Sequence, residues 1–174
     1  MADLYVSWSA YHQNIERLAV KVYQSQWDFN QIVCLARGGL RVGDLLSRIY
    51  RQPLGILAAS SYYGGEGRSQ GNLTFSENLT MTNKELGDRI LLVDDLVDSG
   101  VTLQESVIWL QERYPGQIAE IRTAVIWYKA SSIVVPDYYV EYLRNNPWIH
   151  QPFEVYEQVS LAELAGRDLA RLSG

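Results

Sequence analysis

The chain has 174 residues, and its 47% hydrophobic content is enough to build the core of one globular domain. Its 15 lysine and arginine residues against 20 aspartate and glutamate residues give a formal net charge of −5. This balance argues against proteins that bind nucleic acid or an anionic membrane through a basic face. It leaves open a local site for a small phosphorylated ligand.

Three features bear on the compartment. The longest apolar run, residues 54–59, is far shorter than the ~20 residues that span a bilayer. No basic region and apolar stretch follow Met1, so we expect no secretory signal. The single cysteine, Cys34, cannot form an internal disulfide and is typical of a reducing compartment. We therefore expect a cytoplasmic protein without a membrane partner.

The first part of the chain predicts helices that alternate with strands. Residues 9–23 have apolar side chains at helical spacing, and residues 32–36 form a continuous apolar run that predicts a buried strand. A helix over 40–50 and a strand over 54–61 follow. We expect Cys34, in the first of these strands, to be an inert core residue.

The stretch 63–82 has a different character. It is rich in glycine and polar residues and has almost no apolar pattern, and Arg68 is its one strong cation. A loop of about twenty residues is long for a compact domain, and such loops are usually functional or mobile. We therefore predict a lid over residues 63–82.

The second part continues the alternation. The predicted elements are a strand over 90–93, a helix over 103–113, strands over 118–128 and 138–142, and a terminal helix over 161–172 that opens with the capping box Ser160 to Glu163. Apolar strands alternating with helices predict an α/β fold with a mostly parallel sheet covered on both faces. Ligands of such sheets bind at the carboxyl ends of the strands.

Residues 90–102 are the most informative segment. An apolar strand leads to Asp94 and Asp95, and small and hydroxyl residues connect them to a helix. Backbone N–H groups at such a junction can bind a phosphate, while the carboxylates can accept hydrogen bonds from sugar hydroxyls or hold Mg²⁺. An isolated acidic pair usually only caps a helix, and receiver domains place theirs after the first strand. Here the pair follows two strands and the only later lysine is Lys129, which excludes a receiver domain.

This segment resembles the signature of the type I phosphoribosyltransferases, which use 5-phosphoribosyl 1-pyrophosphate (PRPP). Residues 36–40, 61–62, 127–129, 136–140 and 147–153 are similar, in the same order, to stretches of the bacterial xanthine–guanine phosphoribosyltransferases. The resemblance covers roughly residues 4–157. It implies a single phosphoribosyltransferase domain over 1–174 with that family's fold, including a small hood over about 143–157 and a homo-oligomer, either dimer or tetramer.

The resemblance also implies a PRPP site, with Mg²⁺ as cofactor near Asp95. The residues it assigns to PRPP are Arg37, Gly38, Arg68, Asp94, Asp95, Asp98, Ser99, Gly100, Val101 and Thr102. Asp94 and Asp95 would bind the ribose hydroxyls, and residues 98–102 would surround the 5′-phosphate. Arg37 would bind the pyrophosphate, with a non-trans peptide between Arg37 and Gly38. Asp98 would be the general base that takes a proton from the purine.

Three further residues are implied in base binding. Lys129 would donate to the 6-oxo group of a purine, Trp148 would stack on the base, and the backbone of Ile149 would read the 2-position. The expected function is transfer of the phosphoribosyl group to hypoxanthine, guanine or xanthine in nucleotide salvage. His150 stands where the family commonly has glutamate, so the sequence does not select among these bases; we interpret it as a surface or structural residue.

Two alternatives remain open at this stage. The first is a phosphoribosyltransferase for another base, such as a pyrimidine. The second is a non-catalytic regulator that binds PRPP on the same fold. Regulators that act on nucleic acid need a basic face or a helix-turn-helix module, and the net charge of −5 argues against them.

Overall fold

The structure, a computed structural model, describes residues 3–61 and 73–172. Contacts divide the chain into two compact units: residues 14–146 form the larger one, and residues 1–13 with 147–174 form the smaller one. None of the described helices is long and apolar enough to cross a membrane. Arg68 and the first half of the predicted lid lie outside the described residues.

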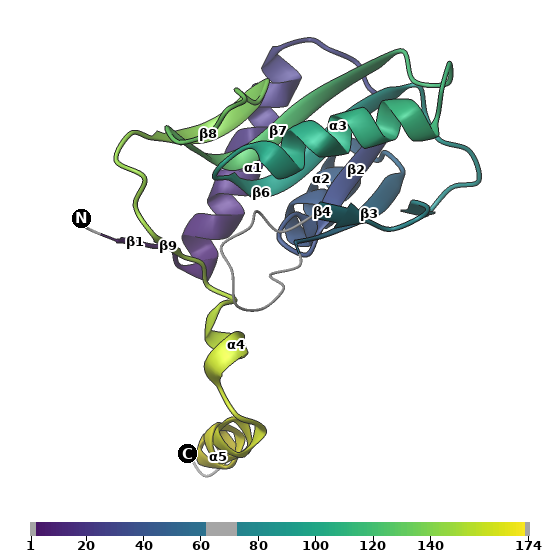
Figure 1. The fold of residues 1–174 in the computed structure, drawn as a ribbon. Helices are drawn as coiled ribbons and strands as arrows, with labels where there is room; N and C mark the ends of the chain where they lie inside the picture. Colours follow the sequence, from purple (N-terminus) through teal and green to yellow (C-terminus); the bar gives the residue numbers. More distant parts are fainter. Residues whose placement is uncertain (1–2, 62–72, 173–174) are drawn as a thin grey trace, which may run out of the picture. The chain divides into compact units, whose positions relative to one another are not determined.

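One sheet forms the centre of the larger unit (Figure 1). Its parallel strands are β2 (Gln31–Ala36), β3 (Leu54–Ser61), β6 (Arg89–Val97), β7 (Glu120–Lys129) and β8 (Tyr138–Leu143), in the spatial order β3-β2-β6-β7-β8. Two short strands, β4 (Leu73–Phe75) and β5 (Thr80–Met81), pair antiparallel with β3. The predicted α/β fold with a mostly parallel sheet is confirmed.

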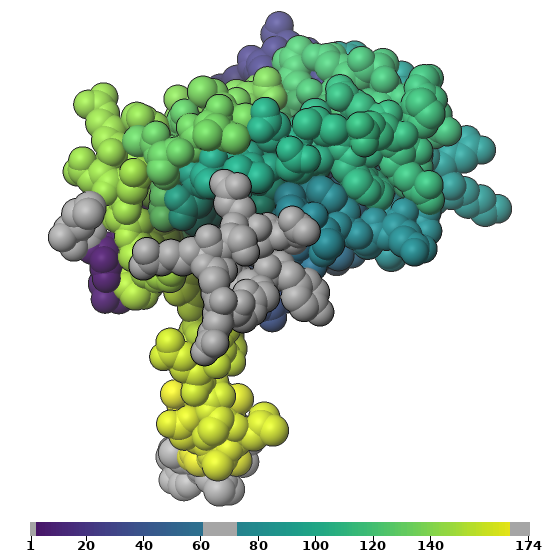
Figure 2. Space-filling view, viewed as in Figure 1, coloured from purple at the N-terminus to yellow at the C-terminus, as the bar shows by residue number. Residues whose placement is uncertain are grey.

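Helices cover both faces of this sheet. The helices are α1 (Trp8–Gln24), α2 (Leu40–Tyr50) and α3 (Val101–Arg113). Because successive strand residues point to opposite faces, Val33 and Leu35 pack in one cluster with Leu110 of α3, whereas Cys34 lies against Gly43 of α2. Figure 1 shows α3 on the near side of the sheet, and in Figure 2 its side chains cover that face.

Cys34 is fully buried in β2. Burial, together with the nearby carboxylates of Asp94 and Asp44, raises the pKa of its thiol to about 12. The thiolate is the reactive form of cysteine, so this side chain is chemically inert in the folded protein, as the sequence predicts.

The strand order changes direction between β2 and β6. From β2 the chain moves outward to β3, and from β6 it moves through β7 to β8 on the other side. Pairing of β2 with β6 ends at Cys34 opposite Val93, but β6 and β7 stay paired as far as Val97 opposite Tyr128. The predicted strand end at Val93 is therefore wrong, because β7 keeps β6 extended for four more residues. Ligands of open parallel sheets bind at such a switch point.

The segment predicted to be a loop over 63–82 is partly strand. Its described second half contains β4 and β5, which hydrogen-bond to β3, and their apolar residues Leu73, Phe75 and Met81 are only half-buried. A strand at the edge of a sheet does not have to be buried on both faces, so its sequence lacks the continuous apolar run of a central strand. The lid itself stays a prediction for the residues before β4.

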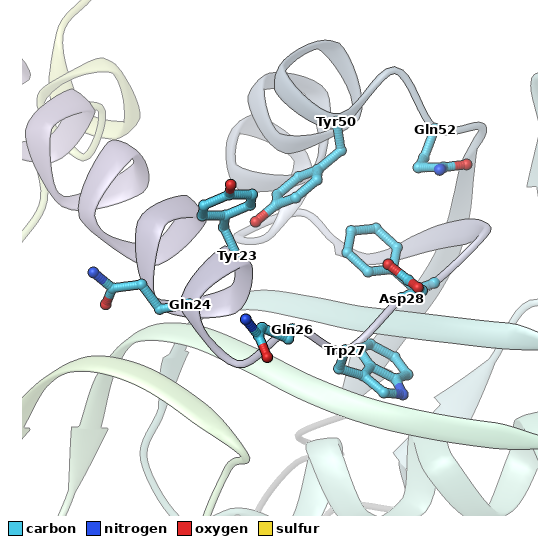
Figure 3. A pocket seen from close by; sticks show the side chains of 8 residues that line it. Tyr23, Gln24, Gln26, Trp27, Asp28, Tyr50 and Gln52 are labelled. Atoms are coloured by element: carbon cyan, nitrogen blue, oxygen red, sulfur yellow. The ribbon is translucent and has the colours of Figure 1, made fainter.

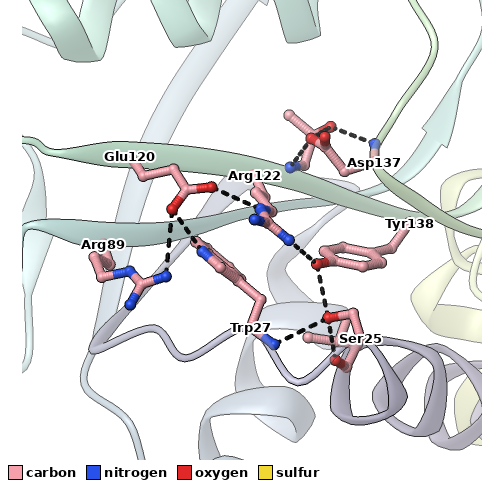
Figure 4. Close-up of polar contacts among 9 residues, drawn as sticks. Ser25, Trp27, Arg89, Glu120, Arg122, Asp137 and Tyr138 are labelled. Atoms are coloured by element: carbon pink, nitrogen blue, oxygen red, sulfur yellow. Dashed lines mark hydrogen bonds and ion pairs between the residues drawn. The ribbon is translucent and has the colours of Figure 1, made fainter.

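A polar network fixes the starts of the strands at the opposite end of the sheet (Figure 4). Glu120 accepts hydrogen bonds from Trp27 Nε1 and Arg122 Nε, both at 2.8 Å, and from Arg89 at 3.3 Å. The first two of these bonds lower the pKa of Glu120. Asp137 accepts from the backbone N–H and the hydroxyl of Thr123, both at 2.8 Å. Asp137 therefore has a structural role in joining β7 to β8.

The smaller unit contains two short parallel strands and two helices. β1 (Leu4–Tyr5) pairs with β9 (Ile149–His150), and α4 (Val155–Gln158) and α5 (Leu161–Leu172) follow. The predicted capping box is confirmed at the start of α5. The Ser160 N–H donates to Glu163 Oε2 at 2.7 Å, and the Glu163 N–H donates to Ser160 Oγ at 3.2 Å.

Candidate active site

The turn after β2 packs directly on the acidic pair of β6. A Cβ atom added at Gly38 would overlap the Asp95 carboxylate, and one at Gly39 would lie 2.7 Å from the Val93 carbonyl oxygen. Only glycine fits at either position. The structure thus brings the exposed Arg37 next to the acids, at the switch point of the sheet. The cis peptide bond lies between Ala36 and Arg37, one residue before the predicted position.

Asp94 and Asp95 form an acidic pair within β6, with Asp95 buried and Asp94 half-buried. The Asp95 N–H donates to Asp94 Oδ1 at 2.9 Å, and Asp95 is only 7% exposed. Burial and repulsion from Asp95 raise the pKa of the Asp94 carboxyl well above its usual range, although the N–H groups of Asp95 and Gly39 oppose the shift. A pair of this kind favours a ligand that brings hydroxyl donors or a cation.

The acidic pair fits a cation that takes part of its ligands from a substrate. Mg²⁺ usually binds one or two carboxylates together with substrate phosphates and water. Across residues 3–61 and 73–172, no three histidine, cysteine, aspartate or glutamate side chains gather into a metal site. Asp94 and Asp95 are two carboxylates, a number that a Mg²⁺ site shared with a substrate can use.

Residues 98–102 form a phosphate-type loop between β6 and α3. Gly100 has φ +84° immediately before α3, no side chain caps the helix, and the first turn has no acidic residue. Backbone N–H groups and the helix dipole at such an end attract an anion. Ser99 Oγ accepts a hydrogen bond from the Val101 N–H at 3.4 Å, so this hydroxyl lies beside the first N–H groups of α3. Thr102 lies in the first turn of the same helix.

The segment between β7 and β8 supports this loop. The Ile133 N–H donates to the Ser99 carbonyl at 2.9 Å. A Cβ at Gly100 would overlap Ser132 Oγ and would lie 2.8 Å from Val134 Cγ2. The loop therefore has a defined conformation that depends on glycine at position 100.

Asp98 and Lys129 lie together at the ends of the paired strands β6 and β7. Lys129 Nζ donates to Asp98 Oδ2 at 2.9 Å. The lysine side chain is 7% exposed and the aspartate side chain is 59% exposed. A buried ammonium thus fixes one oxygen of a carboxylate that stays open to a ligand.

Two residues that the sequence did not single out complete this arrangement. Ser131 Oγ lies 3.2 Å from both Asp98 Oδ1 and the Asp98 carbonyl oxygen, and it can donate to either. The Ser131 N–H in turn donates to Asn146 Oδ1 at 3.2 Å. In the sequence, the only indication of this role is that Ser131 is the second residue after Lys129. The tertiary structure is needed to place its hydroxyl against Asp98.

Trp148 and Ile149 belong to the smaller unit. Trp148 is 63% exposed, and Ile149 is 4% exposed. The carbonyls of Trp148 and His150 accept hydrogen bonds from Leu4 at 2.8 Å and Val6 at 3.0 Å. Since alternate residues of a strand point their backbone groups to opposite edges, the N–H and C=O of Ile149 lie on the edge of β9 away from β1.

A cavity of about 680 Å³ lies elsewhere in the larger unit (Figure 3). It is lined by the ends of α1 and α2 and by the residues before β2, including Tyr23, Trp27, Tyr50 and Gln52. This is the amino end of β2, opposite the turn that holds Arg37. None of the predicted site residues lines this cavity, so it is separate from the candidate site.

Comparisons with known proteins agree with this geometry. Residues 5–158 match the family described as the phosphoribosyl transferase domain. The xanthine-guanine phosphoribosyltransferase of Idiomarina loihiensis is 29% identical over 167 residues, which cover 95% of each chain. That of Gluconobacter oxydans is 27% identical over 150 residues, which cover 86% of this chain and 83% of the relative.

Solved structures give the same result. A purine phosphoribosyltransferase from Pyrococcus horikoshii superposes with a TM-score of 0.71 at 30% identity, covering 88% of this chain and 95% of that one. The xanthine-guanine-hypoxanthine phosphoribosyltransferase of Helicobacter pylori has a TM-score of 0.74 at 25% identity and covers 90% of this chain and 97% of that one.

Proposed function

The chain belongs to the phosphoribosyltransferase family, and on this premise we propose that it transfers the 5-phosphoribosyl group of PRPP to a 6-oxopurine in nucleotide salvage. The bases in question are hypoxanthine, guanine and xanthine, and pyrophosphate is the second product. The named relatives with this activity support the assignment. The observation that carries it is the pair formed by Asp98 and Lys129.

This pair is complementary to one edge of a 6-oxopurine. With a proton on N7, such a base presents an N–H donor beside the 6-oxo acceptor. The Asp98 carboxylate accepts hydrogen bonds and the Lys129 ammonium donates them, and the two groups are 2.9 Å apart. A 6-aminopurine would place an amino donor against the ammonium and leave both groups unpaired, which is costly in a partly buried site.

The proposed PRPP site combines the turn after β2 with the end of β6 and the loop that follows it. The N–H groups of residues 99–102 bind the 5′-phosphate, Asp94 and Asp95 accept hydrogen bonds from the ribose hydroxyls, and Arg37 with Gly38 binds the pyrophosphate. Mg²⁺ held at Asp95 and by PRPP would neutralise charge on the leaving group. We assign Arg68 and the lid to the exclusion of water from the site.

In the reaction, a ring nitrogen of the base attacks the anomeric carbon while the bond to pyrophosphate breaks. Positive charge develops on the ribose, as at glycosidic centres in general. The attacking nitrogen is the imidazole nitrogen without a proton, and Asp98 takes the proton from N7 as the new bond forms, a role that typically contributes about 10²- to 10⁴-fold. Lys129 holds the 6-oxo group, Trp148 stacks on the ring, and the backbone of Ile149 reads the 2-position. The family match over residues 5–158 includes parts of both units, which supports one functional domain.

We also propose that the protein is a cytoplasmic homo-oligomer, a dimer or a tetramer. Exposed apolar side chains support an assembly, among them Ile133 at 64% and Val135 at 70% exposure. Light scattering after size-exclusion chromatography measures the subunit number, and a monomer at micromolar concentration would contradict this part of the proposal.

The central experiment is a panel of bases. The protein is incubated with PRPP, Mg²⁺ and hypoxanthine, guanine, xanthine, adenine or uracil, and released pyrophosphate is measured. We expect release with at least one 6-oxopurine and not with adenine or uracil, and loss of most turnover in Asp98→Asn with PRPP binding retained. Turnover with uracil alone would indicate a pyrimidine enzyme. PRPP binding without turnover on any base would indicate a regulator.

A further inference from the structure

His150 connects three segments of the smaller unit. Its Nε2 lies 3.0 Å from Asp3 Oδ2, and its Nδ1 lies 4.0 Å from Glu154 Oε2. The imidazole also stacks on the Tyr5 ring, with centroids 4.3 Å apart and an angle of 12° between the planes. One ring therefore joins the N-terminal residues, β9 and the residues before α4.

The backbone joins the same segments, but only over a short length. β1 and β9 have two residues each, and the hydrogen bonds from the Leu4 N–H to the Trp148 carbonyl and from the Val6 N–H to the His150 carbonyl are 2.8 Å and 3.0 Å long. An isolated two-stranded ladder is marginally stable in water, and this one is shorter than an ordinary strand. Side-chain contacts across it must therefore contribute much of what holds β9 in place.

We propose that Asp3 and His150 form a clasp that holds the base-binding strand, so that His150 is a positioning residue for purine recognition. This inference rests on the proposed function, in which Trp148 and Ile149 contact the base. Trp148 is 63% exposed, so its orientation depends on the backbone that carries it. The carbonyls of Trp148 and His150 accept hydrogen bonds from Leu4 and Val6, so the residues on both sides of Ile149 are held. The backbone groups of Ile149 itself face away from β1.

The groups around the ring favour the clasp. The imidazole faces Asp3, Tyr5 and Glu154. A protonated imidazole donates from both nitrogens and attracts both carboxylates, and a neutral one still donates from one nitrogen.

The experiment compares the full-length wild type with His150→Ala, Asp3→Asn and the charge-swapped double variant Asp3→Lys/His150→Glu. The chain has 2 histidines, and His12→Gln is the matched control because the contacts of His12 within the described residues are with the rings of Trp8 and Tyr11. One readout is the set of KM values for hypoxanthine and PRPP with kcat, at pH 6. The other is amide hydrogen exchange at Leu4 and Val6, which needs no turnover.

At pH 6 we expect His150→Ala and Asp3→Asn to raise KM for hypoxanthine about two- to fivefold, the range that an exposed ion pair supports. KM for PRPP and kcat stay unchanged, and exchange at Leu4 and Val6 accelerates. The charge swap restores part of both readouts, because the introduced carboxylate pairs with the introduced lysine but also faces Glu154.

The outcomes separate the two proposals. Unchanged exchange in His150→Ala overturns the clasp. Faster exchange with an unchanged KM for hypoxanthine overturns its link to base binding. If the wild type uses no 6-oxopurine, the proposed function fails, while the exchange measurement still decides whether His150 and Asp3 hold β9.

Discussion

Each oxygen of the Asp98 carboxylate has a donor within 3.2 Å, namely Lys129 at Oδ2 and Ser131 at Oδ1. The lysine is implied in base binding, whereas the hydrogen bonds of the serine within the described residues join it to the aspartate and, through its N–H, to Asn146. Ser131 is therefore suited to orient the proposed general base.

We predict that Ser131→Ala lowers kcat about three- to tenfold, the value of one hydrogen bond. KM for PRPP stays constant. Ser131→Thr keeps a hydroxyl and restores most of kcat. A lower kcat with no recovery in the threonine variant would assign Ser131 a purely structural role.

The acidic pair is unfavourable for stability in the absence of ligand. Asp94 and Asp95 repel each other in a poorly solvated position, as the raised pKa of Asp94 reflects. We predict that Asp94→Asn raises the melting temperature of the ligand-free protein at neutral pH, by about 2–4 °C for each kcal/mol of repulsion relieved. The same substitution weakens PRPP binding. Calorimetry with and without PRPP measures both effects, and a lower melting temperature in the ligand-free variant would contradict the argument.

Elements with a strong apolar pattern were predictable to within one or two residues. Strand β3 and helix α2 have the predicted bounds, Leu54–Ser61 and Leu40–Tyr50, because buried faces dictate their side chains. β6 was predicted too short because its pattern becomes acidic at Asp94, while its backbone continues to pair with β7. β1 and β9 were missed, since two-residue strands far apart in sequence leave no periodic signal.

The site residues likewise divide into those that a sequence motif identifies and those that only the tertiary structure identifies. The acidic segment and Lys129 were identified from the sequence, and the structure places Asp98 and Lys129 in contact because paired strands end together. Ser131, Asn146 and the clasp partner Asp3 could not be predicted, because each acts through a tertiary contact rather than a motif. The roles proposed for Arg37, Arg68, Trp148 and Ile149 stay predictions for the enzyme assays.

The loop between β6 and α3 is the element whose conformation most constrains the site. Gly100→Ala combines an unfavourable φ of +84° with an overlap against Ser132 and Val134. We predict that it lowers PRPP affinity at least about tenfold, since moving the loop by a fraction of an ångström misaligns several N–H donors at once. Isothermal titration with PRPP and Mg²⁺ measures this loss.

Gly116→Ala is the matched control for this loop. Gly116 also has a positive φ, +73°, but nothing lies within 4 Å of a Cβ added there. Both variants carry the backbone cost of alanine at positive φ, so both lose some thermal stability. Only Gly100→Ala should lose PRPP affinity, and equal losses in the two variants would show that the effect is general destabilisation.

At the scale of the whole molecule, the net charge of −5 opposes a substrate that is itself a multiply charged anion. Three acidic residues lie in one stretch of five residues at the site, namely Asp94, Asp95 and Asp98. Backbone N–H groups can bind one phosphate, but the pyrophosphate then lies near the acidic pair. We therefore expect binding of PRPP to require a divalent cation, which would offset the repulsion between carboxylates and pyrophosphate.

We predict that PRPP at about a hundredfold excess over its Kd raises the melting temperature by about 5–10 °C with Mg²⁺ present, and by little in EDTA. Mg²⁺ alone should shift it less than Mg²⁺ with PRPP, because the acidic pair offers only two carboxylates. Thermal-shift titrations across the four combinations of PRPP and Mg²⁺ measure the coupling. Equal stabilisation by PRPP with and without Mg²⁺ would mean that basic side chains, rather than a shared cation, balance the charge of the substrate.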